Sequence, residues 1–246
     1  MKRKHKKSLM IVGPPTTGKT ELALTIARKL DGEVINADKF YLFKGFPSTT
    51  GLPDFSEYPD IPRHLYEILE PGEEALPTPE YVKRVRELEA DIFLRDRLPI
   101  IEGCYHRFAR ALVEEDQRDP ESFHLMIGIK WPSGLNLEER VVRRINEIFD
   151  IREGINEVKA ALDKGYRETF VMRKGSIIRP TVEYLDGSID LETAKKKAIT
   201  GLLYAAYKSY SRFLDVPGIT WYEYDEKNKE PLVEQIVLKI SESNDS

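Results

Sequence analysis

A glycine-rich segment near the amino terminus carries the residues best suited to chemistry. Its residues are Gly13, Pro14, Pro15, Thr16, Thr17, Gly18, Lys19 and Thr20. The run matches the pattern GxxxxGK[ST] in full, with an apolar segment (residues 9–12) before it and a helix-like segment (residues 21–30) after it. A strand, a glycine loop and a helix start form the context in which backbone N–H groups cradle phosphate oxygens. We therefore predict a phosphate or diphosphate site here rather than a chance glycine-rich turn.

Two side chains of this segment add to what the backbone can do. Lys19 supplies a mobile positive charge that can reach phosphate oxygens, and the hydroxyl of Thr20 can ligate a cation bound to the phosphates. The sequence thus predicts Mg²⁺ as the cofactor, with Thr20 as its protein ligand. It leaves open what the phosphates are attached to.

A carboxylate follows at a distance that suggests a shared site. Asp38 lies 19 residues beyond Lys19, at the end of a second strand-like segment (residues 33–37). Ligands of open α/β sheets bind at the carboxyl ends of the strands, so Asp38 would face a group next to the bound phosphate. It could act as a general base or, in a small-molecule kinase, as a Mg²⁺ ligand. The structural alternative is a helix N-cap.

The elements that must position these residues alternate between strand and helix in the first half of the chain. Strand-like segments are residues 9–12, 33–37, 99–103, 123–130 and 219–224, and helix-like segments are 19–30, 78–97, the region from 137 onward and 191–214. We predict an α/β fold, with a P-loop NTPase-like parallel sheet, flanking helices and a mostly helical C-terminal half. The long Pro/Gly-rich stretch 43–79 is expected to be a functional loop with short ordered pieces.

The helical half carries apolar stripes that indicate packing rather than a cofactor site. One stripe lies within residues 137–148 and another within 198–213. We predict one P-loop α/β domain over residues 8–242, with its helical part at about 135–215. A basic flexible tail (residues 1–7) and a short tail (243–246) would flank it.

Composition and charge limit the partners and the cellular location that we expect. The formal net charge of −4 gives no reason to expect a large nucleic-acid footprint, although local basic patches are compatible with it. No apolar run approaches the roughly 20 residues of a membrane span, so no membrane partner is expected. The single cysteine, Cys104, excludes an intramolecular disulfide and favours a reducing, cytoplasmic location. The oligomeric state is left open.

Several segments together resemble the isopentenyltransferase family, which contains tRNA dimethylallyltransferases and adenylate isopentenyltransferases. After the P-loop, residues 32–38 (GEVINAD) resemble the family's GEIISAD, and residues 61–71 (IPRHLYEILEP) resemble its VPHHLIDILDP. Residues 97–103 are similar to the strand that enters the family's GGT turn. Residues 144–149 fit its RVxxML helix, and residues 183–189 fit its YLxGxI. The motifs occur in the family's order and span roughly residues 9–225.

The resemblance implies a mechanism and a set of residues. Dimethylallyl diphosphate would bind with its diphosphate in the P-loop, where Lys19, Mg²⁺ and the loop amides would stabilise the departing pyrophosphate. Asp38 would accept a proton from the exocyclic amine of an adenine as that nitrogen attacks the allylic carbon. Arg144 matches the family's diphosphate-contacting arginine, with a solvated helix charge as the alternative. Thr50 and Arg179 match acceptor-side positions of the family.

The chain also departs from the family's pattern. Leu52 replaces a basic residue of the GTAKP loop, Cys104 and Tyr105 replace the second glycine and the threonine of the GGT turn, and residues 177–178 replace the GY of GYRE. The family's KRQ is Ala206-Tyr207-Lys208 here. A protein that binds diphosphate without transferring a prenyl group would show the same pattern.

Two acceptors fit the resemblance. The tRNA enzymes carry an inserted segment that grips the anticodon arm, and the gap from Gly103 to Arg144 leaves room here for only one helix, one strand and a loop. The compact length and acidic net charge favour a free adenine nucleotide (AMP, ADP or ATP, a cytokinin-type reaction) as partner. The alternative is the adenosine next to the anticodon of tRNA, which residues 61–71 and 183–189 resemble more closely. A P-loop small-molecule kinase and a non-catalytic nucleotide-binding protein are further alternatives.

Overall fold

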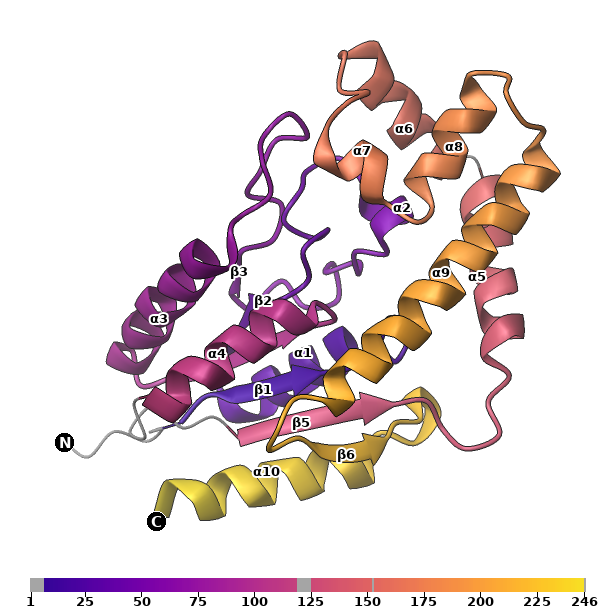
Figure 1. The fold of residues 1–246 in the computed structure, drawn as a ribbon. Helices are drawn as coiled ribbons and strands as arrows, with labels where there is room; N and C mark the ends of the chain where they lie inside the picture. Colours follow the sequence, from indigo (N-terminus) through magenta and orange to yellow (C-terminus); the bar gives the residue numbers. More distant parts are fainter. Residues whose placement is uncertain (1–6, 119–124, 152, 246) are drawn as a thin grey trace.

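The computed structural model describes residues 7–118, 125–151 and 153–245 (Figure 1). Its strands are β1 (Leu9–Val12), β2 (Gly32–Asn36), β3 (Arg63–His64), β4 (Leu98–Gly103), β5 (Leu125–Lys130) and β6 (Thr220–Glu223). All neighbouring strands are parallel, in the order β3-β2-β4-β1-β5-β6. The predicted parallel α/β sheet is confirmed.

Helices cover both faces of this sheet, and two apolar clusters fill the layers between them. Alternate residues of each strand point to opposite faces. Leu9 and Ile11 of β1 join the cluster beneath α1 (Lys19–Leu30) and α10 (Glu230–Asp245). Met10 and Val12 join the cluster beneath α3 (Thr78–Leu94) and α4 (His106–Arg118). Because both faces are buried, the central strands read as continuous apolar runs.

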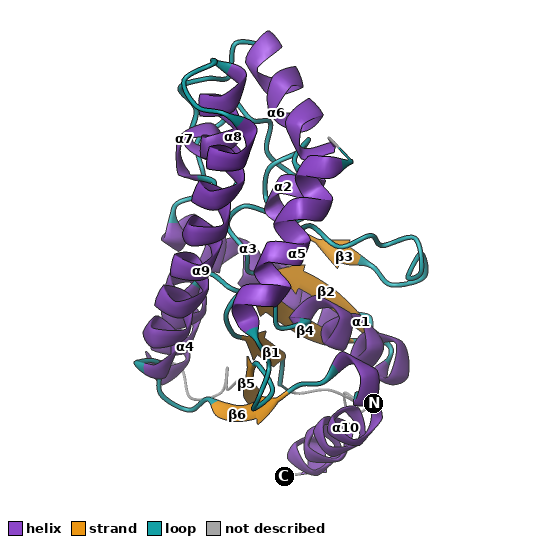
Figure 2. Cartoon of the chain, turned by 90° about the vertical axis from the view of Figure 1, so that its right-hand side faces the viewer, coloured by secondary structure: helices purple, strands orange, loops and turns teal. Residues whose placement is uncertain are grey.

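The helical half forms an arm that extends away from the sheet (Figures 1 and 2). Two long helices, α5 (Leu137–Asp150) and α9 (Leu191–Leu214), run along the arm, which also holds α6 (Glu153–Asp163), α7 (Phe170–Lys174) and α8 (Ile178–Leu185). Asn136 caps α5 by accepting from the Glu139 N–H (3.1 Å), and Asp190 caps α9 by accepting from the Thr193 N–H (2.7 Å). The predicted stripes of α5 and α9 pack against each other as a third apolar cluster.

The sequence located most elements to within a few residues. Helix α9 has the predicted bounds, and α3 ends at Leu94, three residues before the predicted end. The loop 43–79 holds α2 (Pro47–Thr50) and β3 as its ordered pieces, and a 3₁₀ helix (Glu226–Asn228) follows β6. The carboxyl-terminal helix continues to Asp245, so the tail expected from residue 243 is helical up to that point. The basic tail, apart from Lys7, and residues 123–124 of the predicted fourth strand lie outside the described residues.

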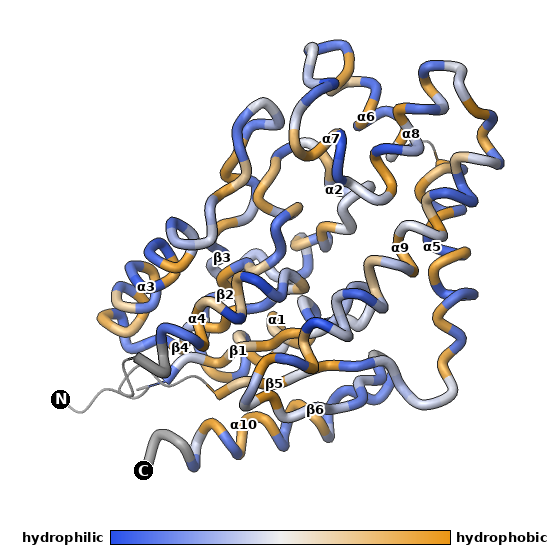
Figure 3. The backbone as a smooth tube through the Cα atoms, in the orientation of Figure 1, coloured by the Kyte–Doolittle hydropathy of each residue, from blue (hydrophilic) through white to orange (hydrophobic). Residues whose placement is uncertain are grey.

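Hydrophilic and hydrophobic residues alternate along the outer helices (Figure 3), as expected of helices that bury one side against the core. None of the helices in the described part of the chain combines the length and apolarity that crossing a bilayer demands.

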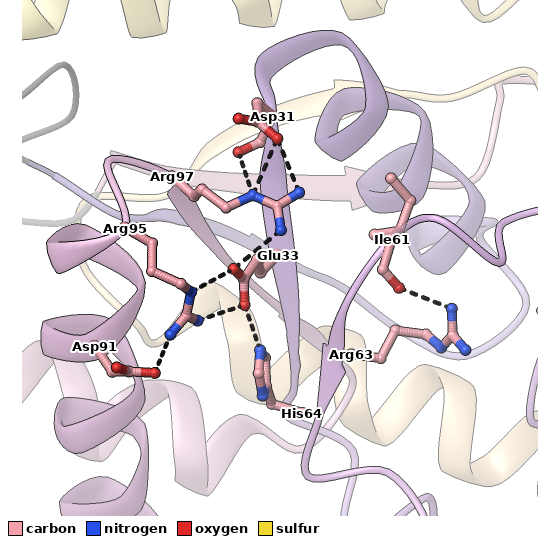
Figure 4. A network of polar contacts seen from close by, with 8 residues as sticks. All are labelled: Asp31, Glu33, Ile61, Arg63, His64, Asp91, Arg95 and Arg97. Atoms are coloured by element: carbon pink, nitrogen blue, oxygen red, sulfur yellow. Dashed lines mark hydrogen bonds and ion pairs between the residues drawn. The ribbon is translucent and has the colours of Figure 1, made fainter.

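A buried ion-pair network ties β2 and β3 to the end of α3 (Figure 4). The Glu33 carboxylate is only 1% exposed and accepts from Arg95 (2.8 and 3.1 Å), from Arg97 (3.2 Å) and from His64 Nε2 (2.7 Å). Burial alone would raise the pKa of Glu33, but the hydrogen bonds from Arg95 and His64 outweigh it and hold the pKa below its usual value. Glu33 lies on β2 before the strand's carboxyl end, so His64 serves this network and not the phosphate site.

This network predicts an acid-sensitive contribution to stability. Because the native pKa of Glu33 is lowered, its pairing stabilises the fold above the ordinary glutamate pKa and is lost as the pH falls through the native value. We expect Glu33→Gln to lower the free energy of unfolding by about 2–4 kcal/mol at pH 7, since it leaves two arginines short of their shared partner. Urea unfolding at pH 7 and near pH 3 measures this. An equal loss at both pH values would show that the charge of Glu33 contributes nothing.

Candidate active site

The P-loop lies between β1 and α1, and its conformation is held by its own side chains. Gly18 adopts a left-handed φ of 79°, which a residue with a side chain rarely adopts, at the point where α1 begins. The Thr17 hydroxyl donates to the Pro14 carbonyl (3.0 Å), and Lys19 Nζ donates to the same carbonyl (2.7 Å). No side chain caps α1, so its first amides are free to bind an anion.

The strand order determines what lies beside the P-loop. β4 separates β1 from β2, so the carboxyl end of β4 lies between the P-loop and Asp38. Two interstrand spacings place the ends of β1 and β2 about 10 Å apart. That gap can hold a diphosphate on the β1 side and a reacting group on the β2 side.

Asp38 is buried and directly held by β4. Its Oδ1 accepts from the Phe40 N–H (2.8 Å), and its Oδ2 accepts from the Cys104 thiol (2.6 Å). Burial, followed by the charge of Asp38, raises the pKa of Cys104 well above its usual value, so the thiol stays protonated and donates. Gly103 makes this contact possible, because a Cβ there would overlap the Ala37 backbone.

Glu102 is the second carboxylate of the site. It is fully buried at the end of β4, and its Oε1 accepts from the Tyr66 hydroxyl (2.5 Å). Burial raises the pKa of Glu102 and the charge of Asp38 adds to this, while Lys19, Tyr66 and Thr20 act in the opposite direction. Its other oxygen, Oε2, has no hydrogen-bond partner.

Arg144 approaches from the arm. Its guanidinium lies against Gly51, at the end of α2, where a Cβ would come within 2.9 Å of Nη2. Arg144 makes no hydrogen bond or ion pair with any residue in the described ranges. Burial raises the pKa of the Tyr41 phenol well above its usual value. The charge of Asp38 adds to this increase, and the charge of Arg144 acts against it. The Tyr41 hydroxyl donates to the Gly51 carbonyl (2.8 Å), so Arg144 and this phenol lie on the same turn at the end of α2.

The remaining predicted residues fall outside this centre. The Thr50 hydroxyl donates to the Phe46 carbonyl (2.7 Å), which places it on α2 near Arg144 without contact to Asp38. Arg179 lies on α8 in the arm, where it pairs with Glu183 (3.3 Å) and is mostly exposed. Residues 177 and 178, which replace the family's GY, are buried apolar residues of the arm. The structure places Asp38 one strand away from the P-loop and Arg144 beside Gly51 at the end of α2, while Arg179 lies apart from them in the arm.

The residues present fit a divalent cation only in company with phosphate. In the described part of the chain, no group of three or more His, Cys, Asp or Glu side chains is arranged to hold a metal ion. Thr20, at 9% exposure, and the buried unpaired Oε2 of Glu102 offer oxygen ligands of the kind that Mg²⁺ uses. Mg²⁺ commonly binds through one or two protein oxygens plus substrate phosphates and water.

A cluster of cations lies around His106, at the start of α4 and along α9, and we call it the α4–α9 basic patch. Its members are Lys39, Arg107, Arg110, Lys208 and Arg212. His106 lies among them, and its pKa is lowered first by burial and then by four of these cations. Arg107, Lys208 and Arg212 form no ion pair with a residue that the structure describes. Ser209 anchors α9 here by donating to the Cys104 carbonyl (2.9 Å).

Sequence reasoning missed four residues of the site. Glu102 could have been found, since a glutamate ends an otherwise apolar buried strand. Tyr41, Tyr66 and the contact of Cys104 with Asp38 depend on how the loop 43–79 folds and on the strand order. Trp131 donates through Nε1 to the Thr16 hydroxyl (3.1 Å), and no sequence pattern predicts this contact either.

Comparisons with known proteins agree with this geometry. The chain is 26% identical to a tRNA dimethylallyltransferase of Caldanaerobacter subterraneus, covering 93% of this chain and 95% of that protein. The alignment spans 302 positions, more than the 246 residues of this chain, so the relative carries residues that this chain lacks. A tRNA dimethylallyltransferase 2 of Syntrophotalea carbinolica is 44% identical over 95 residues, 39% of this chain and 31% of that protein. No protein-family model matches the chain.

Solved structures share the fold over nearly the whole chain. A tRNA isopentenylpyrophosphate transferase of Bacillus halodurans superposes with a TM-score of 0.83 at 21% identity, covering 98% of both chains. A eukaryotic dimethylallyltransferase acting on tRNA gives a TM-score of 0.77 at 16% identity, covering 96% of this chain and 79% of that one. The chain thus resembles tRNA dimethylallyltransferases from end to end in sequence, shares the fold of tRNA isopentenyltransferases, and carries its motifs in the order of the isopentenyltransferase family.

Proposed function

We propose that this protein transfers the dimethylallyl group of dimethylallyl diphosphate to the exocyclic N6 amine of an adenosine in tRNA. The observation that carries the reaction is the placement of Asp38 across one strand from the P-loop. Arg144, which lies beside Gly51 and the Tyr41 phenol, supports it. The names of the relatives support tRNA over the free adenine nucleotide that length and net charge favour. The cytokinin-type reaction finds no support among these relatives.

The reaction breaks the allylic C–O bond and forms a C–N bond, with pyrophosphate as the leaving group. Lys19, the first amides of α1 and Arg144 would bind the diphosphate and balance the charge that develops on it. Thr20 would hold Mg²⁺, which when bound adds positive charge at the diphosphate oxygens. Each of these groups acts on the leaving group and none on the nucleophile.

Asp38 supplies the other half of the chemistry. The N6 amine is a weak nucleophile because its lone pair is delocalised into the adenine ring. Asp38, held by the Phe40 amide and the Cys104 thiol, would accept the proton that the amine loses as the C–N bond forms. A positioned base of this kind contributes roughly 10² to 10⁴ in rate.

The α4–α9 basic patch supports a polyanionic acceptor. Arg107, Lys208 and Arg212 repel one another and have no carboxylate partner among the described residues, although the chain as a whole carries a net charge of −4. Positive groups clustered without partners favour phosphate contacts along a nucleic acid. A free nucleotide would need far fewer of them.

The test offers the protein Mg²⁺, dimethylallyl diphosphate and either unmodified tRNA or AMP, ADP or ATP, with products identified by mass. We expect prenylated tRNA and little prenylated nucleotide. The double variant Arg107→Ala/Lys208→Ala should weaken tRNA binding and reduce the slope of log affinity against log salt by roughly 1–2. Prenylated AMP as the main product would overturn the tRNA assignment, and ATP consumption with phosphate transfer would overturn the prenyltransferase itself.

A further inference from the structure

Glu102 is a buried carboxylate that the reaction outlined above does not use. It belongs to β4, in register with Ile11 of β1 and Asn36 of β2, so it lies in the middle of the sheet's carboxyl edge. Its side chain is 0% exposed. A carboxylate in such a position costs several kcal/mol of desolvation unless partners compensate for it.

Only one of the two oxygens of Glu102 has a hydrogen bond of good geometry. Oε1 accepts from the Tyr66 hydroxyl (2.5 Å), while Oε2 has no partner that meets hydrogen-bond geometry, although the Thr20 hydroxyl lies close enough to favour the charged carboxylate as a donor. Buried oxygens without a well-formed hydrogen bond are rare in native proteins and call for an explanation, such as a bound ion, a bound water or a functional role.

The surroundings of Oε2 identify the ligand as a cation. Glu102 points to the α1 face of the sheet, in alternation with the core residue Ile101 on the other face. On that face the first turn of α1 presents the Thr20 hydroxyl and the Lys19 ammonium, and both groups favour the charged form of Glu102. A diphosphate in the P-loop would bring its own negative charge toward this carboxylate. A cation between the two anionic groups would relieve this repulsion.

We propose that Glu102, through Oε2, is a second protein ligand of the divalent cation that Thr20 holds at the diphosphate. This inference rests on the proposed diphosphate site. It adds Glu102 to that site, and the charge of Glu102 makes diphosphate binding depend on the metal. Without the cation, Glu102 and the diphosphate repel each other. With the cation, Glu102 strengthens the ternary complex. The hydroxyl of Thr20 alone, being neutral, would give a much weaker dependence.

The experiment measures binding rather than turnover. Mn²⁺ binding is followed by the loss of the free-ion electron paramagnetic resonance signal in the presence of inorganic pyrophosphate, and pyrophosphate binding is measured by calorimetry with and without Mg²⁺. We expect Glu102→Gln to weaken Mn²⁺ binding roughly 10- to 100-fold. The same variant should bind pyrophosphate without metal at least as tightly as the unaltered protein. A loss with metal and no loss without it is a pattern that a merely structural residue cannot produce.

Glu33→Gln is the matched control. It removes another buried carboxylate of the same sheet, one that pairs with Arg95 and His64 before the carboxyl end of β2, so Mn²⁺ affinity should stay within about threefold. Thermal unfolding checks that both variants fold. Glu102→Asp, which keeps the charge on a shorter side chain, should retain part of the metal dependence if Glu102→Gln proves unstable. Equal Mn²⁺ affinity in Glu102→Gln and unaltered protein would overturn the inference. Failure of the unaltered protein to bind pyrophosphate with metal would instead overturn the proposed diphosphate site.

Discussion

Replacing Asp38 by asparagine should abolish prenyl transfer while leaving diphosphate binding intact. Asparagine has the shape of aspartate and can still accept from the Phe40 amide, but its carboxamide cannot take a proton from the acceptor amine. We expect the rate of the chemical step to fall by about 10² to 10⁴. Pyrophosphate affinity should change by less than about threefold, because the P-loop lies two strands away. Single-turnover transfer and pyrophosphate calorimetry measure the two quantities separately.

A matched variant isolates the role of Asp38 from the loss of a charge. Asp60 is exposed, pairs with Arg28 at 3.0 Å and has no contact with the P-loop. Asp60→Asn should leave the stability nearly unchanged, because an exposed ion pair contributes little, and it should leave the transfer rate unchanged. Turnover near the unaltered rate in Asp38→Asn would show that another group removes the proton, and the general-base assignment would then be wrong.

The two residues that the sequence predicted best, Lys19 and Asp38, are those whose positions follow from local rules. A P-loop between a strand and a helix fixes the first, and the end of a buried strand fixes the second. Both rules need only neighbours along the chain. The sheet, its parallel direction and the helix α9 followed from periodicity in the same way.

The contacts between these residues could not be read from the chain, because they depend on strand order. Cys104 lies 66 positions from Asp38, and the two meet only because β4 is inserted between β1 and β2. Tyr66 reaches Glu102 only through the course of the loop 43–79, whose composition specifies turns but not their direction. Arg179 shows that a motif match alone can mislead. It occupies a position of the family's motif, but in this chain it forms an ion pair with Glu183 in the arm.

Replacing Lys19 by alanine should remove both diphosphate binding and transfer. Lys19 is 7% exposed, and its ammonium donates to the Pro14 carbonyl and favours the charged forms of Glu102 and Cys104. Its loss leaves the Glu102 carboxylate near an incoming diphosphate without the ammonium that offsets its charge. We expect a fall of about 10² to 10³ in the rate at saturating donor, together with much weaker pyrophosphate binding measured by calorimetry.

Two further variants test the role of the Lys19 charge: one removes a distant lysine of the same helix, and the other also removes the charge of Glu102. Lys29 lies at the far end of the same helix and pairs with Glu230 (2.8 Å), so Lys29→Ala should leave binding and transfer unchanged. If Lys19 offsets the repulsion from Glu102, Glu102→Gln should raise metal-free pyrophosphate affinity more in the Lys19→Ala background than in the unaltered protein. Such non-additivity is expected of two groups that share one ligand. Equal effects of Glu102→Gln in both backgrounds would mean that Lys19 and Glu102 do not act on the same bound diphosphate.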